Sequence, residues 1–237
     1  MSPTVEREAL IVILTGAGVS AESGLRTFRA ADGLWENHRV EDVATPAAFA
    51  RDPRLVQRFY DERRRHLRQV EPNAAHHALA RLEQEWPGEV LLVTQNVDDL
   101  HARAGSRNLI YMHGELLKAR CLRCGCVSVW EEDILRESQC PSCTHAGCLR
   151  PHIVWFGEMP LELDRIGAAL DRCSVFAAIG TSGNVYPAAG FVSRVPPGAH
   201  TIELNLEVSM VSSAFRECIQ GKATEVVSAW VDRLLTP

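Results

Sequence analysis

The chain has 237 residues, of which 46% are hydrophobic and 23% are charged, and its net charge is −5 at pH 7. This composition excludes an intrinsically disordered chain, and the acidic balance argues against a nucleic-acid-binding protein. No run of about 18 uninterrupted apolar residues occurs, and the first apolar stretch follows a short leader of mixed charge. We therefore expect a cytoplasmic globular protein that neither enters a membrane nor binds nucleic acid directly.

Six segments of the chain are apolar at nearly every position, and small or polar residues follow most of them. Continuous apolar runs are typical of parallel strands that are buried on both faces. The expected strands are residues 9–15, 90–94, 109–112, 152–155, 175–179 and 201–204. Helical spacing of apolar residues occurs at 53–70, 74–85, 161–172 and 224–235. The sequence therefore predicts an α/β fold.

Two stretches do not fit the alternation of strands and helices, and we interpret them as insertions. One is polar and mostly helical, and the other contains most of the cysteines. We expect residues 36–70 and 118–149 to form a smaller domain. Residues 1–35, 71–117 and 150–237 would then form the larger domain.

Five of the expected strands are followed directly by glycine or polar residues. In an open parallel sheet, ligands bind beyond the carboxyl ends of the strands, so these residues converge on one edge. We expect the functional site there. The clusters are Gly16-Ala17-Gly18, Gln95-Asn96-Val97-Asp98, His113-Gly114, Gly180-Thr181-Ser182 and Asn205-Leu206-Glu207.

The first cluster has the pattern G-x-G-x-x-A between Gly16 and Ala21. Such glycines allow a tight turn and a close approach of the backbone to a pyrophosphate, and a following helix N-terminus donates N–H groups. An ordinary glycine-rich turn has the same pattern, although the position after a strand favours a dinucleotide site. Glu22 and Arg29 belong to the same loop or are solvated surface charges.

Six of the eight cysteines lie close together in the chain and include two C-x-x-C pairs. Four thiolates at this spacing can surround Zn²⁺ as a closed tetrahedron with no open position for catalysis, which predicts a structural zinc ion. Cys148 is an alternative ligand. Cys173 and Cys218 lie alone in apolar surroundings, where we expect buried, inert thiols. The four expected ligands are Cys121, Cys124, Cys140 and Cys143.

His113 is a candidate general base because it directly follows an expected strand and precedes a glycine. The pKa of imidazole, about 6.5, allows proton transfer at neutral pH. A catalytic and a structural role are equally compatible with this position alone. His152 competes for the role but begins an expected strand, and His76 and His101 lie in helical stretches, where local hydrogen bonds are the more usual role.

The helix expected after Pro53 has an arginine within its apolar stripe. Arg63 is three residues after Tyr60 and four before Leu67, so a guanidinium is expected on the buried face. Tyr60 and Arg63 share that face and could bind a carboxylate together, or Arg63 could pair with an acidic side chain of this protein. Arg64, like Arg65 and Arg68, is expected on the solvated face.

Taken together and in this order, the motifs resemble the sirtuins, a family of NAD-dependent protein deacylases. The resemblance extends from about residue 9 to 235. It implies a Rossmann-type parallel-sheet domain and a smaller domain with a helical module and a zinc module, with NAD and acyl-lysine meeting between them. The segments that carry the resemblance are 16–24, 27–29, 94–98, 113–115, 154–158, 180–182 and the four cysteines.

The resemblance also implies ligand contacts for particular residues. Phe28 would shield the reactive ribose of NAD, Arg29 would help to position it, and Ala223 would lie at the adenine end. The segment 154–158 would pair with the substrate backbone as an added strand. The implied NAD contacts are Gly16, Ala17, Gly18, Ser20, Glu22, Phe28, Arg29, Trp35, Gln95, Asn96, Val97, Asp98, Gly180, Thr181, Ser182, Asn205, Leu206, Glu207 and Ala223. The implied substrate contacts are Ala44, Tyr60, Arg63, Val154, Trp155, Phe156, Gly157 and Glu158.

Within the family, Tyr60-x-x-Arg63 resembles the signature of members that remove succinyl and malonyl groups, and Ala44 matches a small residue that widens the same pocket. The implied reaction consumes NAD as a co-substrate. The acyl oxygen attacks the nicotinamide ribose, nicotinamide leaves, and His113 acts as general base on a ribose hydroxyl. Water then completes the release of free lysine and O-acyl-ADP-ribose.

Three other functions use the same features. A deacetylase without acidic-acyl preference and a mono-ADP-ribosyltransferase would both keep the cofactor site. A non-enzymatic NAD-sensing or zinc-ribbon module would lack His113 or Asn96, and both are present. The expected partners are acyl-lysine proteins or peptides, and we expect a monomer.

Overall fold

The computed structural model describes residues 8–26, 34–35 and 38–236 and confirms the α/β class. Its centre is a six-stranded parallel sheet in the order β11-β10-β9-β1-β4-β5. After β1, the chain adds β4 and β5 on one side of β1. It then adds β9, β10 and β11 on the other side, so the strand order reverses next to β1. The strands are β1 Ile11–Thr15, β4 Val90–Thr94, β5 Leu109–Tyr111, β9 Val175–Ile179, β10 His200–Asn205 and β11 Glu217–Gln220.

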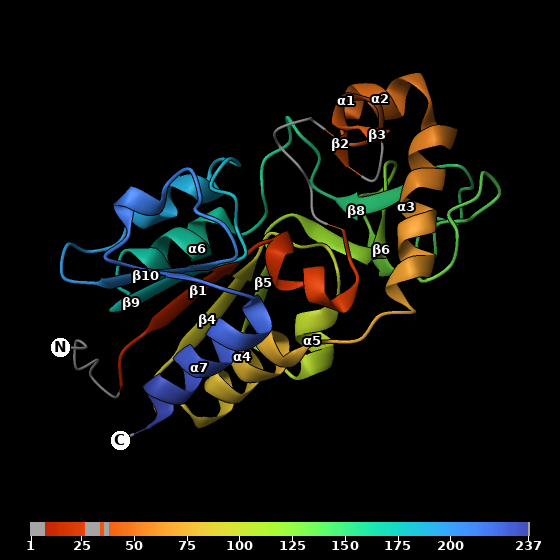
Figure 1. Ribbon diagram of the computed structural model, residues 1–237. Helices are drawn as coiled ribbons and strands as arrows, with labels where there is room; N and C mark the ends of the chain where they lie inside the picture. Colours follow the sequence, from red (N-terminus) through yellow and green to blue (C-terminus); the bar gives the residue numbers. More distant parts are fainter. Residues whose placement is uncertain (1–7, 27–33, 36–37, 237) are drawn as a thin grey trace.

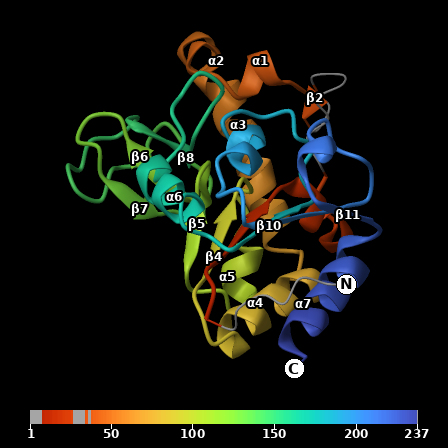
Figure 2. The ribbon, with the colours of Figure 1, turned by 90° about the vertical axis from the view of Figure 1, so that its left-hand side faces the viewer.

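Helices cover both faces of this sheet. Ile11 and Ile13 of β1 pack toward α4 (Ala74–Glu85) and α7 (Ala223–Leu235), which lie side by side (Figures 1 and 2). Val12 and Leu14 point the other way, toward α6 (Leu163–Leu170) and the 3₁₀ helix Ala188–Ser193. β1 is buried at every position, which explains why its sequence does not alternate. No helix in the described part of the chain is long and apolar enough to cross a bilayer.

A second unit lies beside the C-terminal edge of the sheet (Figure 1). It contains the antiparallel strands β6 (Gly114–Cys121), β7 (Val127–Val129) and β8 (Leu149–Ile153) in the order β7-β6-β8. Its helical part consists of α1 Val40–Val43, α2 Pro46–Arg51 and α3 Pro53–Leu67, beside the short strands β2 Leu34–Trp35 and β3 His38–Arg39. The division into two domains stays a prediction. One of its expected boundaries, at residue 118, falls inside β6.

The expected strand 152–155 does not belong to the parallel sheet, so that prediction is wrong. The strand is β8, which ends at Ile153 and pairs antiparallel with β6. Ile153 and Trp155 are buried against Phe59 and Tyr60 of α3 instead of against the large sheet. A continuous apolar run indicates that a strand is buried, but it does not indicate which strand pairs with it, and this explains the error.

The prediction that Arg64 is solvated is also wrong. Arg64 is 0% exposed, and it lies four residues after Tyr60 and three before Leu67, on the buried stripe itself. Its Nε donates to the Leu116 carbonyl at 3.0 Å, and its Nη1 lies 2.6 Å from the carboxylate of Asp61. The side chain therefore joins α3 to β6.

Candidate functional site

The glycine loop after β1 packs against the loop after β9, backbone to backbone. The N–H of Gly18 donates to the Gly180 carbonyl at 2.9 Å, and a Cβ at Gly18 would lie 2.7 Å from the Gly180 Cα. A Cβ at Gly16 would lie 2.7 Å from the Gly180 oxygen. Gly180 itself has φ +63°, in the left-handed region. Glycine is thus required at these positions because the two loops pack too closely to leave space for a Cβ atom.

The expected helix after the glycine loop does not form. Two 3₁₀ turns, Ala17–Val19 and Ala21–Ser23, occupy its place. The carboxylate of Glu22 in the second turn accepts hydrogen bonds from the N–H and hydroxyl of Thr224, at 3.0 and 2.9 Å. Because Thr224 lies in the first turn of α7, next to Ala223, Glu22 fixes the loop to that helix. The helix N-terminus that lies next to the glycine loop is therefore that of α7.

A buried polar cluster lies beneath the loop that follows β4. The side-chain N–H groups of Asn96 donate to the Gly16 carbonyl at 3.2 Å and to the Ser20 hydroxyl at 3.1 Å. Ser20 donates to Asp98 at 3.0 Å and lies 3.3 Å from Nε2 of His76. Burial raises the pKa of Asp98 to about 6 and lowers that of His76 to about 4. The sequence did not single out His76 for this site, because its position in a helix gave no signal of the contact.

A backbone contact with Gln95 orients the imidazole of His113. Its Nδ1 lies 3.1 Å from the carbonyl oxygen of Gln95. Because a carbonyl only accepts, Nδ1 carries the proton and Nε2 keeps a lone pair. Burial lowers the pKa of His113, and its hydrogen bond to Gln95 opposes that effect. The side chain is therefore a neutral base at neutral pH.

The loops after β9 and β10 are held together by Asn205. Its side chain accepts from the N–H of Thr181 and donates to the carbonyl of Thr181, both at 2.9 Å. Ser182, Leu206 and Glu207 are exposed at the same end of the strands. The chain thus presents polar groups from two neighbouring strands along one edge, as predicted from the parallel topology.

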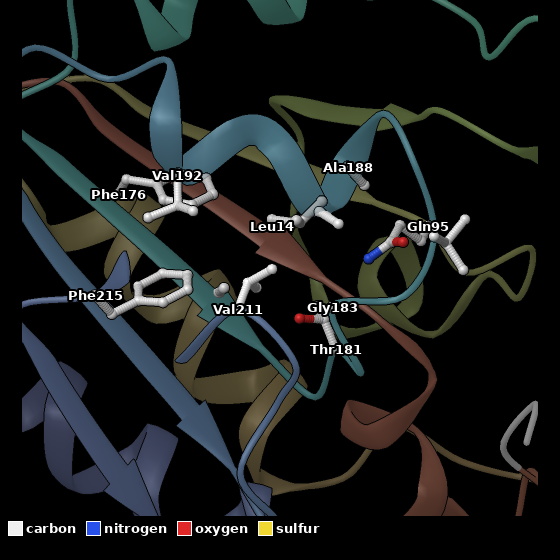
Figure 3. A pocket seen from close by; sticks show the side chains of 12 residues that line it. Leu14, Gln95, Phe176, Thr181, Gly183, Ala188, Val192, Val211 and Phe215 are labelled. Atoms are coloured by element: carbon white, nitrogen blue, oxygen red, sulfur yellow. The ribbon is translucent and has the colours of Figure 1, made fainter. Parts of the chain in front are cut away.

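Two cavities border this edge. Figure 3 shows a mostly apolar one of about 10 Å³, where Gln95 and Thr181 supply the polar groups. A cavity of this volume holds at most one water molecule, so it is too small for a nucleotide. A second, of about 290 Å³, is lined by Asn205 and Glu207 together with Glu203 and Cys218.

The four expected zinc ligands come together. Their sulfur atoms all lie within 4.8 Å of one another. The two C-x-x-C turns have the same backbone form: Gly125 donates to the Cys121 carbonyl at 3.0 Å, and Thr144 donates to the Cys140 carbonyl at 2.9 Å. Gly125 and Thr144 both have positive φ, at +75° and +59°. Four thiols at this spacing fit a tetrahedral Zn²⁺ with a closed shell.

The remaining cysteines differ in exposure. Cys148 lies beside the group, with its sulfur 3.4 Å from that of Cys121. Cys173 is buried, as expected, whereas Cys218 is exposed, so the prediction of a buried thiol is wrong there. Cys218 lies on β11, the edge strand of the sheet in the part of the chain that the structure describes.

The aromatic and cationic residues of α3 meet the segment that follows β8. Tyr60 is 0% exposed, and its hydroxyl accepts a hydrogen bond from the indole N–H of Trp155 at 3.0 Å. Burial raises the pKa of Tyr60. Arg63 is half-buried, donates to the Phe59 carbonyl and lies over the Phe59 ring. Ala44 is buried in the same cluster.

The segment after β8 is fixed from both sides. Val154 donates its N–H to the His113 carbonyl at 2.9 Å, and Phe156 donates to the Ala44 carbonyl at 3.0 Å. The two carboxylate oxygens of Glu158 accept hydrogen bonds from the Arg150 guanidinium, at 2.7 and 2.9 Å. The segment therefore links His113 to the helical module. Gly157 follows with φ +91°.

Arg150 was missed as a site residue, although it is only 3% exposed. Phe28 and Arg29 lie outside the described residues, as does the side chain of Trp35. Val97 is half-buried, and its carbonyl accepts from the N–H of Leu116 at 2.8 Å.

Comparison with known proteins identifies the arrangement. The model of the Sir2 family matches residues 16–187. The chain belongs to the Sir2 family. A relative named NAD-dependent protein deacylase, from Pasteurella multocida, is 61% identical over 232 residues, which cover 97% of this chain and 99% of the relative. The resemblance noted from the sequence is thereby confirmed.

Solved structures of Sir2 homologues have the same fold. A Sir2 homologue in complex with NAD has a TM-score of 0.87 at 41% identity and covers 97% of this chain and 92% of its own. A mutant Sir2 homologue in complex with 2′-O-acetyl ADP ribose has a TM-score of 0.86 at 40% identity, with 96% and 93% covered. The fold of this chain is thus that of a Sir2 protein.

The residues present fit the two groups that family membership implies. For NAD, buried amide, carboxyl and imidazole groups lie at the edge where the two glycine loops meet. For zinc, the donor set is four thiols and no other ligand is needed.

Proposed function

We propose that this Sir2-family enzyme, an NAD-dependent protein deacylase, removes succinyl and malonyl as well as acetyl groups from lysine and releases nicotinamide and O-acyl-ADP-ribose. The observation that carries the acyl preference is the position of Tyr60 and Arg63. They lie about one turn apart on α3, and the Tyr60 hydroxyl contacts Trp155 of the segment 154–158. A phenolic O–H and a guanidinium are suited to an acyl chain that ends in a carboxylate.

The proposed substrate site combines that pair with the backbone after β8. The acyl-lysine peptide lies along residues 154–158 as an added strand. Val154 donates its N–H to the carbonyl of His113, so this segment is tied to the residue of the proposed base. Ala44 contributes a small side chain to the same cluster, and we assign it to the acyl pocket.

His113 is proposed as the general base. Its protonated Nδ1 is held by Gln95, which leaves the lone pair of Nε2 for a ribose hydroxyl. NAD, when bound, supplies the electrophilic ribose carbon and nicotinamide as leaving group. Asn96 and Asp98 are proposed to contact the nicotinamide ribose, and Ser20 orients both through its hydroxyl.

The other site residues are proposed for the remainder of the dinucleotide. The loops after β1 and β9 bind the phosphates, and Asn205, Glu207 and Ala223 bind the adenosine. The zinc group is proposed to be structural, since a closed shell of thiolates cannot activate water. The substrate is proposed to be an acyl-lysine protein. The enzyme is proposed to act as a monomer in which residues 36–70 and 118–149 form the smaller domain.

Nicotinamide release from a panel of acyl-lysine peptides tests the proposal directly. One peptide sequence that carries acetyl, malonyl, succinyl or butyryl lysine separates carboxylate recognition from chain length, because butyryl is the neutral counterpart of succinyl. We expect turnover of acetyl, malonyl and succinyl peptides, with succinyl preferred over butyryl. Equal turnover of succinyl and butyryl peptides would contradict the acidic-acyl preference.

Mass spectrometry of the same reactions separates the alternative activity. A deacylase yields unmodified lysine and O-acyl-ADP-ribose in equal amounts. A mono-ADP-ribosyltransferase would instead leave ADP-ribose on the acceptor and the acyl group on lysine. The second result would reject the proposed chemistry while leaving the NAD site intact.

A further inference from the structure

The cavity of about 290 Å³ lies beside β10 and β11, which are neighbours in the parallel sheet (Figure 2). Its wall comes from β10, from the loop that follows β10 and from β11. The volume is close to the lower end of the range for small-molecule pockets, about 300–1,000 Å³. Asn205 and Glu207 connect the cavity to the edge proposed to bind NAD, whereas Glu203 and Cys218 have no part in the proposed function.

Glu203 is a buried side chain of this wall whose hydrogen bonding is incomplete. It is 2% exposed, and its Oε1 has no hydrogen-bond partner among the described residues. A buried acceptor without a donor costs free energy, which a new donor recovers. The terminal torsion of glutamate is broad, so either carboxylate oxygen can turn toward the cavity. An occupant that donates a hydrogen bond would therefore complete the contacts of Glu203.

The charge of the wall favours a cation. Glu203 and Glu207 supply two carboxylates, and no lysine, arginine or histidine of the described chain lines the cavity. Burial, followed by the carboxylates of Glu203 and Glu217, raises the pKa of the Cys218 thiol. The thiol thus experiences the negative charge of Glu203 in the same cavity. A cleft lined by charge of one sign attracts ligands of the opposite sign.

The geometry favours an organic cation over a metal ion. In the part of the chain that the structure describes, the zinc-site cysteines are the only metal-ligating group within mutual reach. Glu203, Glu207 and Cys218 line one cavity but do not converge in this way. A primary ammonium needs no such convergence, because it has one positive charge and three N–H donors that can reach separate acceptors.

We propose that this cavity is a second ligand site of the enzyme, which binds a small aliphatic primary amine whose ammonium group donates to the carboxylate of Glu203. The hydroxyls of Ser212 and Ser213 and the carboxylate of Glu207 supply further acceptors in the same wall. The site goes beyond the proposed function. It adjoins the proposed NAD edge through Asn205, whose own side chain is already bonded to Thr181.

The test uses the exposed thiol of Cys218 as a reporter within the cavity. Alkylation by iodoacetamide at pH 7 is followed by mass spectrometry of the peptide that contains Cys218, with increasing concentrations of butylamine. 1-Butanol has the same apolar chain without the charge, and tetramethylammonium has the charge without an N–H donor. We expect saturable protection of Cys218 by butylamine and no protection by the other two compounds.

Glu203→Gln keeps the shape of the side chain and removes its charge. We expect it to raise the butylamine concentration for half-protection by about tenfold or more, the loss of a charge-assisted hydrogen bond. Glu217→Gln is the matched control, because Glu217 also raises the pKa of Cys218 but does not line the cavity. It should keep the wild-type concentration for half-protection. Each alkylation rate is compared with the rate of the same variant without amine, since both substitutions alter the reactivity of the thiol.

Calorimetric titration of butylamine into the wild-type protein, with and without NAD, keeps the test independent of any variant. We expect binding of one amine per chain in both conditions. Absence of saturable binding, equal protection by 1-butanol or tetramethylammonium, or an unchanged half-protection in Glu203→Gln would overturn the amine site. Competition between NAD and butylamine would assign the cavity to the dinucleotide and overturn it as well. None of these results alters the test of the proposed function, which measures nicotinamide release from acyl peptides.

Discussion

Arg64 and Asp61 form a buried ion pair one turn apart on α3. Nη1 of Arg64 lies 2.6 Å from Oδ1 of Asp61, and the two side chains are 1% and 7% exposed. The same Asp61 oxygen accepts the N–H of Ile134 at 3.0 Å. Burial raises the pKa of Asp61 and lowers that of Arg64, so for each group the loss of solvation outweighs the attraction of its partner.

Removal of one partner of this pair should therefore be costly. Asp61→Asn leaves the Arg64 guanidinium buried without a counter-charge, and we expect it to lower the free energy of unfolding by about 3 kcal/mol. Urea unfolding measures this. Asp133→Asn is the control, since the pair of Asp133 with Arg65 is partly exposed and worth less than about 1 kcal/mol. Equal losses in the two variants would contradict the prediction.

Loss of His113 should remove turnover on every acyl chain. We expect His113→Ala to lower kcat by about 100-fold or more on acetyl and succinyl peptides alike, as for loss of a general base. His77→Ala is the control, because His77 is exposed on α4. Retention of full turnover by His113→Ala on both peptides would exclude the assigned role.

The pH dependence of the reaction follows from the environment of His113. The base must be neutral, and burial lowers its pKa, so the neutral form persists below pH 6.5. We expect kcat/KM to fall only as the pH decreases below about 6.5, the pKa of free imidazole. An acid limb centred well above that value would mean that His113 is protonated more easily than its burial allows.

The contact between the loops after β1 and β9 leaves no space for a side chain at Gly18. We expect Gly18→Ala to raise the KM for NAD and to lower the free energy of unfolding by about 1–3 kcal/mol, since the new Cβ meets rigid backbone. Gly198→Ala, which has no atom within 4 Å of the added Cβ, should change neither. A Gly18→Ala enzyme with wild-type KM would show that the loop is not constrained by Gly180.

Removal of zinc should unfold the cysteine-bearing unit without a separate effect on chemistry. We expect Cys143→Ser to lose the metal and Cys148→Ser to keep one zinc per chain, measured by metal analysis of the purified proteins. The reason is that Cys148 lies outside the group of four sulfur atoms within mutual reach. Loss of zinc from Cys148→Ser alone would place that thiol among the ligands.

Local patterns predicted much of the fold. β4 and β9 match their expected bounds because continuous apolar runs mark strands buried on both faces. The zinc ligands were predictable from spacing, since a C-x-x-C turn fixes its own geometry. β11 was missed because Glu217 and Gln220 at its ends are polar, as an edge strand allows.

Long-range pairing could not be read from those patterns. The apolar run 152–155 pairs with β6, and nothing in its composition distinguishes that partner from the parallel sheet. Arg64 is buried because Asp61 and the Leu116 carbonyl lie beside it, and the second contact spans 52 residues. Glu22 and Glu158 lie in recognisable motifs, yet their carboxylates bond to Thr224 and Arg150.

The most direct test of the central claim is the specificity of Arg63→Met, measured as kcat/KM with acetyl and succinyl peptides of the same sequence. Methionine keeps the apolar stem and removes the charge. We expect succinyl activity to fall by about 10- to 100-fold, the loss of a charge-assisted hydrogen bond, with a much smaller change for acetyl. An Arg63→Met enzyme that hydrolyses succinyl-lysine as well as the wild type would contradict carboxylate recognition by this helix.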